Sequence, residues 1–130
     1  MTRTRDAAVA PQTSTIRLAQ ATAVLSVLVL LWQFFSAGQL VSGEDALTGH
    51  GAGAIALHVS TGLLLVATGL HARRTRLWWP AALAAVVFVL TFVQAALGSA
   101  GNIIAHVPVA LIVTVGIVWL TAWAFWPPSA

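Results

Sequence analysis

The chain alternates between long apolar runs and short polar segments. Four of the runs come close to or exceed the roughly 20 residues that an α-helix needs to cross a bilayer. They cover residues 17–40, 51–72, 78–97 and 103–126. The pattern therefore predicts an all-α integral membrane protein. We expect a four-helix bundle whose helices run up, down, up and down.

The two ends of the chain are polar or contain proline. Residues 1–16 predict a short disordered cytoplasmic tail, and residues 127–130 a second, shorter cytoplasmic tail. A cleaved signal peptide is the competing interpretation of the first run. That run is longer than a usual signal-peptide core, and Trp32 suits an interfacial anchor, so we expect an uncleaved span.

Three short connections separate the runs. Residues 41–49 contain turn-forming residues and predict an exposed loop. Residues 73–76 form a tight basic loop. Residues 98–102 allow only a turn, which makes the third and fourth helices antiparallel neighbours, and Asn102 is expected to cap the fourth helix.

The composition excludes several classes of protein. It is 59% hydrophobic and only 7% charged, which is typical of a membrane protein. With no cysteine, the chain cannot hold a disulfide, a thiolate metal site, an iron–sulfur cluster or a covalently attached c-type haem. Six arginines without a basic stripe do not predict binding to nucleic acid.

The placement of charge predicts the orientation in the membrane. With four spans, residues 1–17 and the loop at residues 73–76 lie on one side, and these segments contain every arginine. The positive-inside rule makes that side cytoplasmic. We therefore expect a multi-pass protein of the plasma (inner) membrane with both termini in the cytoplasm and with Glu44 and Asp45 outside.

Two histidines lie within the predicted spans. His58 is about two turns below the outer end of the second helix, and His106 about one turn below the outer end of the fourth. An ionisable residue inside a span indicates a functional site. Two imidazoles facing one another across a bundle predict axial ligation of haem b iron. Gly62, one turn after His58, would leave space for the macrocycle, although close helix packing explains a glycine there equally well.

Other polar residues lie at the same depth. Gln33 and Gln94 are expected to hydrogen-bond to a ligand imidazole or a haem propionate, or alternatively to bond between helices. His50, at the outer mouth of the second helix, would contact a propionate, act as a third metal ligand or titrate in solvent. Zinc or copper held by His50, His58 and His106 is a weaker alternative. His71 is expected at the interface, at a helix C-terminus.

Four short strings in this order resemble one family. They are HVSTGL from His58, the arginine pair at Arg73, QAALG from Gln94 and AHV from Ala105. Together they resemble one four-helix half of the haem A synthase family, over residues 50–126. Small bacterial four-helix membrane proteins share the same plan. The resemblance implies that His58 and His106 are the haem ligand pair.

The chain departs from that family in three respects. The family is a duplicated eight-helix protein, so this chain corresponds to one half, and a homodimer would restore the full arrangement. The family's catalytic glutamate precedes its second-helix histidine by three residues, a position that Ile55 occupies here. The outer cysteine pair found in some members is also absent. Oxidation of a haem substituent is therefore not expected.

Two functions remain as hypotheses. The first is a small haem b protein that transfers electrons or handles haem near the outer face. The second is an accessory or assembly subunit without a cofactor, which packs against a larger membrane complex. Whether the chain is an enzyme stays open.

Overall fold

The structure is a computed structural model that describes the backbone of residues 6–126 and the side chains of residues 14–126. It contains four α-helices in this region. They are α1 (Asp6–Val41), α2 (Leu47–Thr75), α3 (Trp79–Ser99) and α4 (Ile103–Phe125). All four are long and apolar enough to cross a membrane. The all-helical, four-span prediction is confirmed at this level.

Helix α1 begins earlier than the sequence pattern predicts. It is helical from Asp6, whereas the first span was expected from Arg17 after a disordered tail. Of that expected tail, residues 6–16 therefore form helix, and residues 1–5 lie outside the described residues, as do residues 127–130. The stretch contains one residue that disfavours a helix, Pro11, and it lies near the start of α1, so the polar composition and the proline do not predict where the helix begins.

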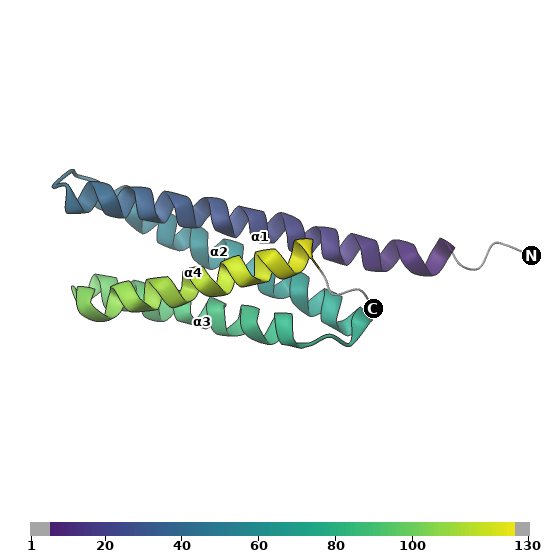
Figure 1. The fold of residues 1–130 in the computed structure, drawn as a ribbon. Coiled ribbons are helices and arrows are strands. Elements are labelled where there is room, and N and C mark those ends of the chain that lie inside the picture. Colours follow the sequence, from purple (N-terminus) through teal and green to yellow (C-terminus); the bar gives the residue numbers. More distant parts are fainter. Residues whose placement is uncertain (1–5, 127–130) are drawn as a thin grey trace, which may run out of the picture.

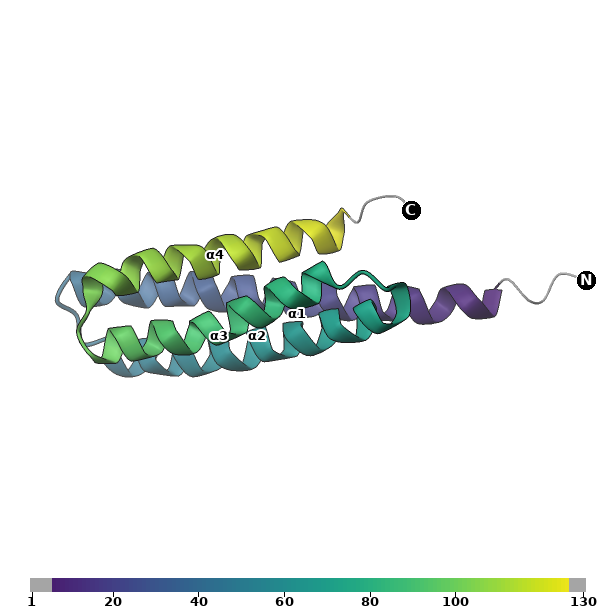
Figure 2. The same ribbon diagram turned by 90° about the horizontal axis from the view of Figure 1, so that it is seen from below.

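The helices form a bundle in which consecutive helices run in opposite directions (Figure 1). Helix α1 packs against α2 and α4, and α3 packs against the same two helices. The remaining pairs, α1 with α3 and α2 with α4, lie diagonally across the bundle, and their backbones do not come into contact (Figure 2). A residue of α2 and a residue of α4 that both point inward therefore face one another across the bundle core.

Local sequence explains the helix ends. Helix α2 ends at Arg76, which adopts a left-handed conformation (φ 64°), and its N–H bonds to the carbonyl of Ala72. Pro80 lies in the first turn of α3, where a missing N–H costs nothing. The predicted cap of α4 is confirmed, because the side chain of Asn102 accepts a hydrogen bond from the Ala105 N–H.

The bundle core is apolar and lies midway along the helices. Leu64, Val87, Ile117 and Leu120 are almost completely buried there. Gly116 of α4 lies so close to Val87 of α3 that an added Cβ would collide with it, so these two helices pack tightly. Many large apolar side chains instead lie on the outer surface, as expected for helices that face lipid.

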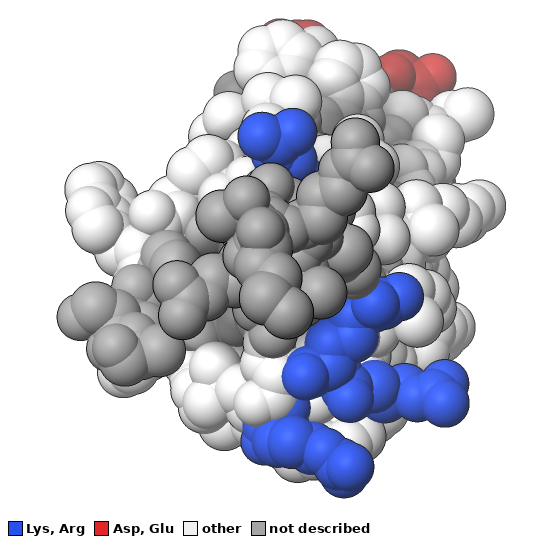
Figure 3. Space-filling model, turned by 90° about the vertical axis from the view of Figure 1, so that its right-hand side faces the viewer, with Lys and Arg blue, Asp and Glu red and all other residues white. Residues whose placement is uncertain are grey.

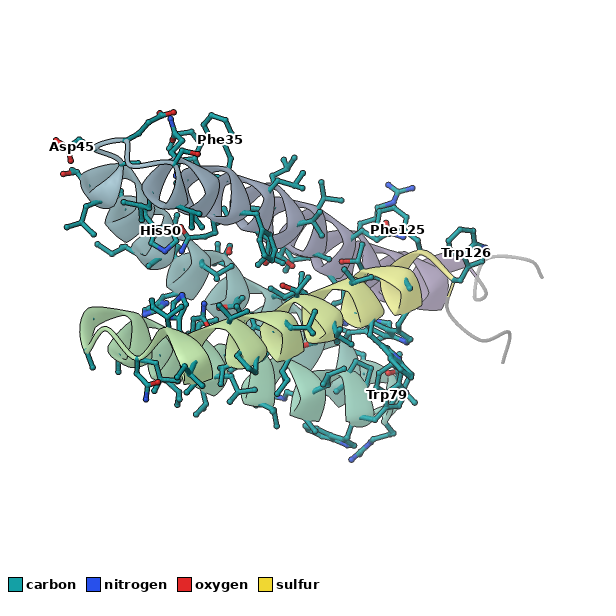
Figure 4. The ribbon with its side chains drawn as sticks, turned by 60° about the vertical axis from the view of Figure 1, so that its left-hand side comes forward. Phe35, Asp45, His50, Trp79, Phe125 and Trp126 are labelled. Atoms are coloured by element: carbon teal, nitrogen blue, oxygen red, sulfur yellow. The ribbon has the colours of Figure 1, made fainter. Side chains whose placement is uncertain are left out.

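The two ends of the bundle differ in charge. Glu44 and Asp45 lie in the α1–α2 connection, beyond the end where α3 also turns into α4 (Figure 4). The described arginines lie toward the opposite end, where Figure 3 shows their blue side chains. We call these the acidic end and the arginine end. The histidines and glutamines proposed for the site all lie in the half of the bundle nearer the acidic end, namely Gln33, His50, His58, Gln94 and His106.

Candidate functional site: a histidine-lined cavity

His106 is held by a single residue of the neighbouring helix. Its Nδ1 lies 2.9 Å from the backbone carbonyl oxygen of Gln94, and its Nε2 lies 3.2 Å from the side-chain nitrogen of Gln94. The carbonyl can only accept, so Nδ1 carries the proton and Nε2 presents its lone pair to the amide. The neutral imidazole is therefore fixed in the tautomer that a metal ligand through Nε2 requires.

Gly98, one turn after Gln94 on α3, gives the ring its space. A Cβ added at Gly98 would lie 2.9 Å from Cε1 and 3.0 Å from Nδ1 of His106. Any larger residue would push the imidazole away from the Gln94 carbonyl. Gly98, Gln94 and the short turn into α4 thus act together to orient His106.

His58 is held differently. Its ring packs against Phe92 of α3, with ring centroids 4.1 Å apart. Its Nδ1 is buried and has no hydrogen-bond partner among the described residues. The side-chain oxygen of Gln94 is in the same situation. A buried polar atom without a partner costs free energy and is often explained by a bound group that the protein is built to receive.

His50 is bound to α1. Its Nδ1 lies 2.9 Å from the Ser36 hydroxyl, which is completely buried. Gln33, with its carboxamide turned to satisfy both groups, donates to the His50 carbonyl at 3.0 Å and accepts from the Ala54 N–H at 3.1 Å. Trp32 adds a bond from its indole N–H to the Gly49 carbonyl at 3.1 Å. The expected roles of His50 as a propionate contact or third ligand remain predictions.

These side chains border two adjoining cavities near the acidic end. One, of about 320 Å³, lies between α2, α3 and the ends of α1 and α4, and His50, His58 and His106 all line it. The other, of about 330 Å³, lies between α1 and α4. Both volumes fall within the roughly 300–1,000 Å³ of ligand sites. We call the first the histidine cavity. The walls that both cavities share are formed by Gln33, His50, Leu57, Gln94 and His106.

Gly62 does not border either cavity. A Cβ there would lie 3.2 Å from the ring of Phe88, so Gly62 allows α2 and α3 to approach one another. Its position favours the helix-packing explanation over space for a macrocycle. Ile55, where the resembling family has its glutamate, is 67% exposed on the outer surface of α2 and also lies outside both cavities.

The three histidines do not form a zinc or copper site in this structure. Within the described part of the chain, no three side chains of histidine, aspartate or glutamate come close enough together to hold one metal ion. His50 is hydrogen-bonded to Ser36 of α1, and His106 to Gln94 of α3.

His71 lies far from the cavity, one turn before the end of α2, which agrees with the expected position at a helix C-terminus, and its side chain is buried. It is 9% exposed, its Nδ1 lies 3.2 Å from the Thr15 hydroxyl, and its ring meets Trp123 edge-on. Thr15, in the part of α1 before Arg17, and Trp123 of α4 together cover His71.

Ser36 and Phe92 complete the surroundings of the histidines but were not predicted from the sequence. Ser36 follows Gln33 by three residues, so both lie on one face of α1, and this spacing was a usable signal. Phe92 gives no such signal, because a phenylalanine in an apolar span is ordinarily lipid-facing or core.

Comparisons of the chain with known protein families, with curated proteins and with solved structures give no match. The resemblance to the haem A synthase family thus depends on the four strings quoted above. The geometry of the histidine cavity is the remaining basis for a function.

Proposed function

We propose that the chain is a small membrane protein that binds haem b, with His58 and His106 as the two iron ligands. The observation that carries this proposal is that His58 and His106, which come from diagonally opposed helices, line the same cavity. The buried Nδ1 of His58 also has no hydrogen-bond partner among the described residues.

The surroundings of His106 fit an iron ligand. Ligand histidines usually donate their second ring N–H to a carbonyl or carboxylate, which raises the basicity of the ligating nitrogen. The Gln94 carbonyl receives that N–H here, and Nε2 keeps its lone pair. To accept haem, the Gln94 carboxamide must turn away from Nε2. This movement breaks one neutral hydrogen bond, the one between the Gln94 side-chain nitrogen and Nε2. It breaks no bond of the side-chain oxygen, which has no partner among the described residues.

The lining of the two cavities also fits a macrocycle. Their walls are mainly aliphatic, with a few polar groups, which is the usual character of a cofactor site. Gln33 and His50 lie on the side nearer the acidic end, where they would meet the propionates. Haem b would supply one-electron transfer between its ferric and ferrous states, and the residues of this chain would orient it and exclude water.

The proposal includes an orientation. The arginine end is assigned to the cytoplasm by the positive-inside rule, so both termini are cytoplasmic and the protein belongs to the plasma (inner) membrane. The histidine cavity then lies near the outer face, where the protein transfers electrons or handles haem. Because no span contains an acid, chemistry on the haem periphery is not part of the proposal.

One observation favours a second candidate, an accessory or assembly subunit without a cofactor. Both ring nitrogens of His106 already have partners on Gln94, as expected if the histidine serves only to join α3 to α4. In that case Gln94 and His106 serve only to hold α3 and α4 together. The protein would then act by packing against a larger membrane complex.

The deciding experiment is a dithionite-reduced minus oxidised visible spectrum of the purified protein, expressed with added haem precursor. We expect a sharp α-band that is lost in His58→Ala and in His106→Ala and kept in His71→Ala, the histidine outside the cavity. Size-exclusion profiles of all variants check that they fold. A flat wild-type spectrum would leave the accessory subunit as the better explanation.

The half-length resemblance also leads us to propose a homodimer that restores eight helices. Crosslinking in the membrane and mass measurement in mild detergent should both give twice the chain mass. Monomer in both measurements would refute this part of the proposal without affecting the haem site.

A further inference from the structure

A third, larger cavity lies at the arginine end, remote from the histidine cavity. It has a volume of about 610 Å³ and opens on the outer surface of α3 and α4. Four tryptophans take part in its walls, Trp79 from α3 and Trp119, Trp123 and Trp126 from the end of α4. Figure 4 shows Trp79 and Trp126 at this end of the bundle. We call this cavity the tryptophan groove.

The groove is apolar and is built on a rigid base. Trp123 is only 5% exposed, and its ring meets those of Trp79 and His71 edge-on, at centroid distances of 5.7 and 5.5 Å. Trp119 and Trp126 instead project outward, 62% and 83% exposed. Buried Trp123 forms the floor, and the exposed rings form the rims.

The length of the groove matches half a bilayer. Its lining on α4 runs from Thr114 to Trp126, which is about 18 Å at 1.5 Å per residue. One leaflet contributes about 15 Å of hydrocarbon. The groove thus extends from near the middle of the membrane to one interface, which is the path of a single acyl chain.

Positive charge lies where the headgroup of that lipid would be. Arg73, Arg74 and Arg76 lie in and just before the connection from α2 to α3, which leads directly into Trp79, and all three are exposed. Figure 3 shows blue side chains gathered on one side of this end. Of the acids whose side chains are described, both lie at the opposite end. An anionic headgroup would therefore meet positive charge that no acid with a described side chain compensates.

We propose that the tryptophan groove binds an anionic phospholipid, with one acyl chain along α4 and the phosphate beside the α2–α3 arginines. The tryptophans contribute flat apolar surface to the chain, and the arginine side chains contribute charged donors to the phosphate. A zwitterionic lipid fills the groove equally well but gains less at the headgroup. This site is independent of haem.

The test is native mass spectrometry of the full chain in mild detergent with equal amounts of phosphatidylglycerol and phosphatidylcholine of identical acyl chains. We expect phosphatidylglycerol to be retained at least about fivefold more than phosphatidylcholine, since each basic residue near a lipid surface changes affinity by roughly this factor. The double variant Arg73→Gln/Arg74→Gln should abolish the preference. Arg17→Gln, which removes an exposed arginine of α1, should retain it.

A second pair of variants tests the acyl chain. Trp119→Ala should lower the retention of both lipids several-fold, whereas Phe125→Ala, an exposed ring beside the groove, should not. The proposal would be overturned if the wild type retained the two lipids equally. It would also be overturned if Arg17→Gln lost the preference for phosphatidylglycerol as fully as the Arg73→Gln/Arg74→Gln variant does. A dimer that Trp119→Ala dissociates would also overturn it, since a second copy would then occupy the groove.

Discussion

The imidazole of His58 and the phenyl ring of Phe92 lie in direct contact, with centroids 4.1 Å apart and planes inclined by 48°. This contact joins α2 to α3 at the level of the histidine cavity. Phe92 in turn meets Phe88 edge-on at 5.1 Å, so His58 continues a row of aromatic rings. With Nδ1 unpartnered within the described residues, the orientation of the His58 ring depends on this packing.

Replacing Phe92 by alanine should therefore lower haem retention. Aromatic pairs contribute about 0.5–1.5 kcal/mol beyond their buried area, so haem occupancy should fall by about two- to tenfold at limiting haem. The measurement is the ratio of Soret to protein absorbance after purification. Val89→Ala, a truncation of another exposed apolar side chain on α3, is the control and should leave the ratio unchanged. Equal ratios in the two variants would contradict an orienting role for Phe92.

Gln94→Ala distinguishes the two proposed functions. If His106 ligates iron, removing the carboxamide leaves the carbonyl bond to Nδ1 in place and frees Nε2, so haem affinity should stay the same or rise. If the protein has no cofactor, the same change removes a helix–helix hydrogen bond and lowers the free energy of unfolding by about 1 kcal/mol.

Haem titration and SDS-induced unfolding measure these two effects. Gln20→Ala is the matched control, because Gln20 donates to the Ala124 carbonyl at 3.1 Å near the arginine end. It should lower stability by a similar amount and leave haem binding unaffected. A loss of haem binding in Gln94→Ala alone would show that the carboxamide supports the cofactor instead of competing with it.

Gly98→Ala should destabilise the end of the bundle that holds His106. The new methyl group would lie 2.9 Å from the imidazole, and overpacking of this kind costs about 1–3 kcal/mol. SDS-induced unfolding gives the change directly. Gly69→Ala, where an added Cβ meets no atom within 4 Å, should be neutral or stabilising, as expected for alanine in a helix. If Gly98→Ala lowered the free energy of unfolding no more than Gly69→Ala does, the ring of His106 would be able to move aside without cost, and the prediction would be wrong.

The orientation in the membrane can be tested with single cysteines, since the chain contains none. Asp45→Cys should react with a membrane-impermeant maleimide in intact cells. Arg74→Cys should react only after permeabilisation, because the proposed orientation places the arginine end in the cytoplasm. The reverse pattern would place the histidine cavity at the cytoplasmic face and exclude an outer electron partner.

The sequence predicts the four helices well, because the length and apolarity of each run are local properties. The Asn102 cap and Pro80 in the first turn of α3 follow from side-chain chemistry within a few residues. The start of α1 at Asp6 does not follow, because the residues before Arg17 are polar but compatible with helix. The burial of His71 depends on that extension and was missed with it.

The candidate site was only partly predictable. The depth of His58 and His106 follows from helical rise, and the contact between Gln94 and His106 follows from their position on either side of a short turn. Which atom of Gln94 meets which ring nitrogen depends on rotamers and on the space at Gly98. The contact of Gly62 with Phe88, in place of a cofactor, depends on the rotation of α2 about its axis, which an apolar sequence with little amphipathic character does not determine.

The side-chain hydrogen bonds between helices have an uneven distribution. Those described here lie near the acidic end, as between Ser36 and His50 or Gln94 and His106, or near the arginine end, as between Gln20 and Ala124. Midway along the bundle, the described hydroxyls of residues such as Thr61 and Thr91 bond to carbonyls of their own helix. The described polar bonds between helices thus hold the bundle near its tips, and midway along it the helices are joined by apolar packing such as that of Gly116 against Val87. A substitution at the middle of the bundle therefore changes packing without breaking a described hydrogen bond between helices.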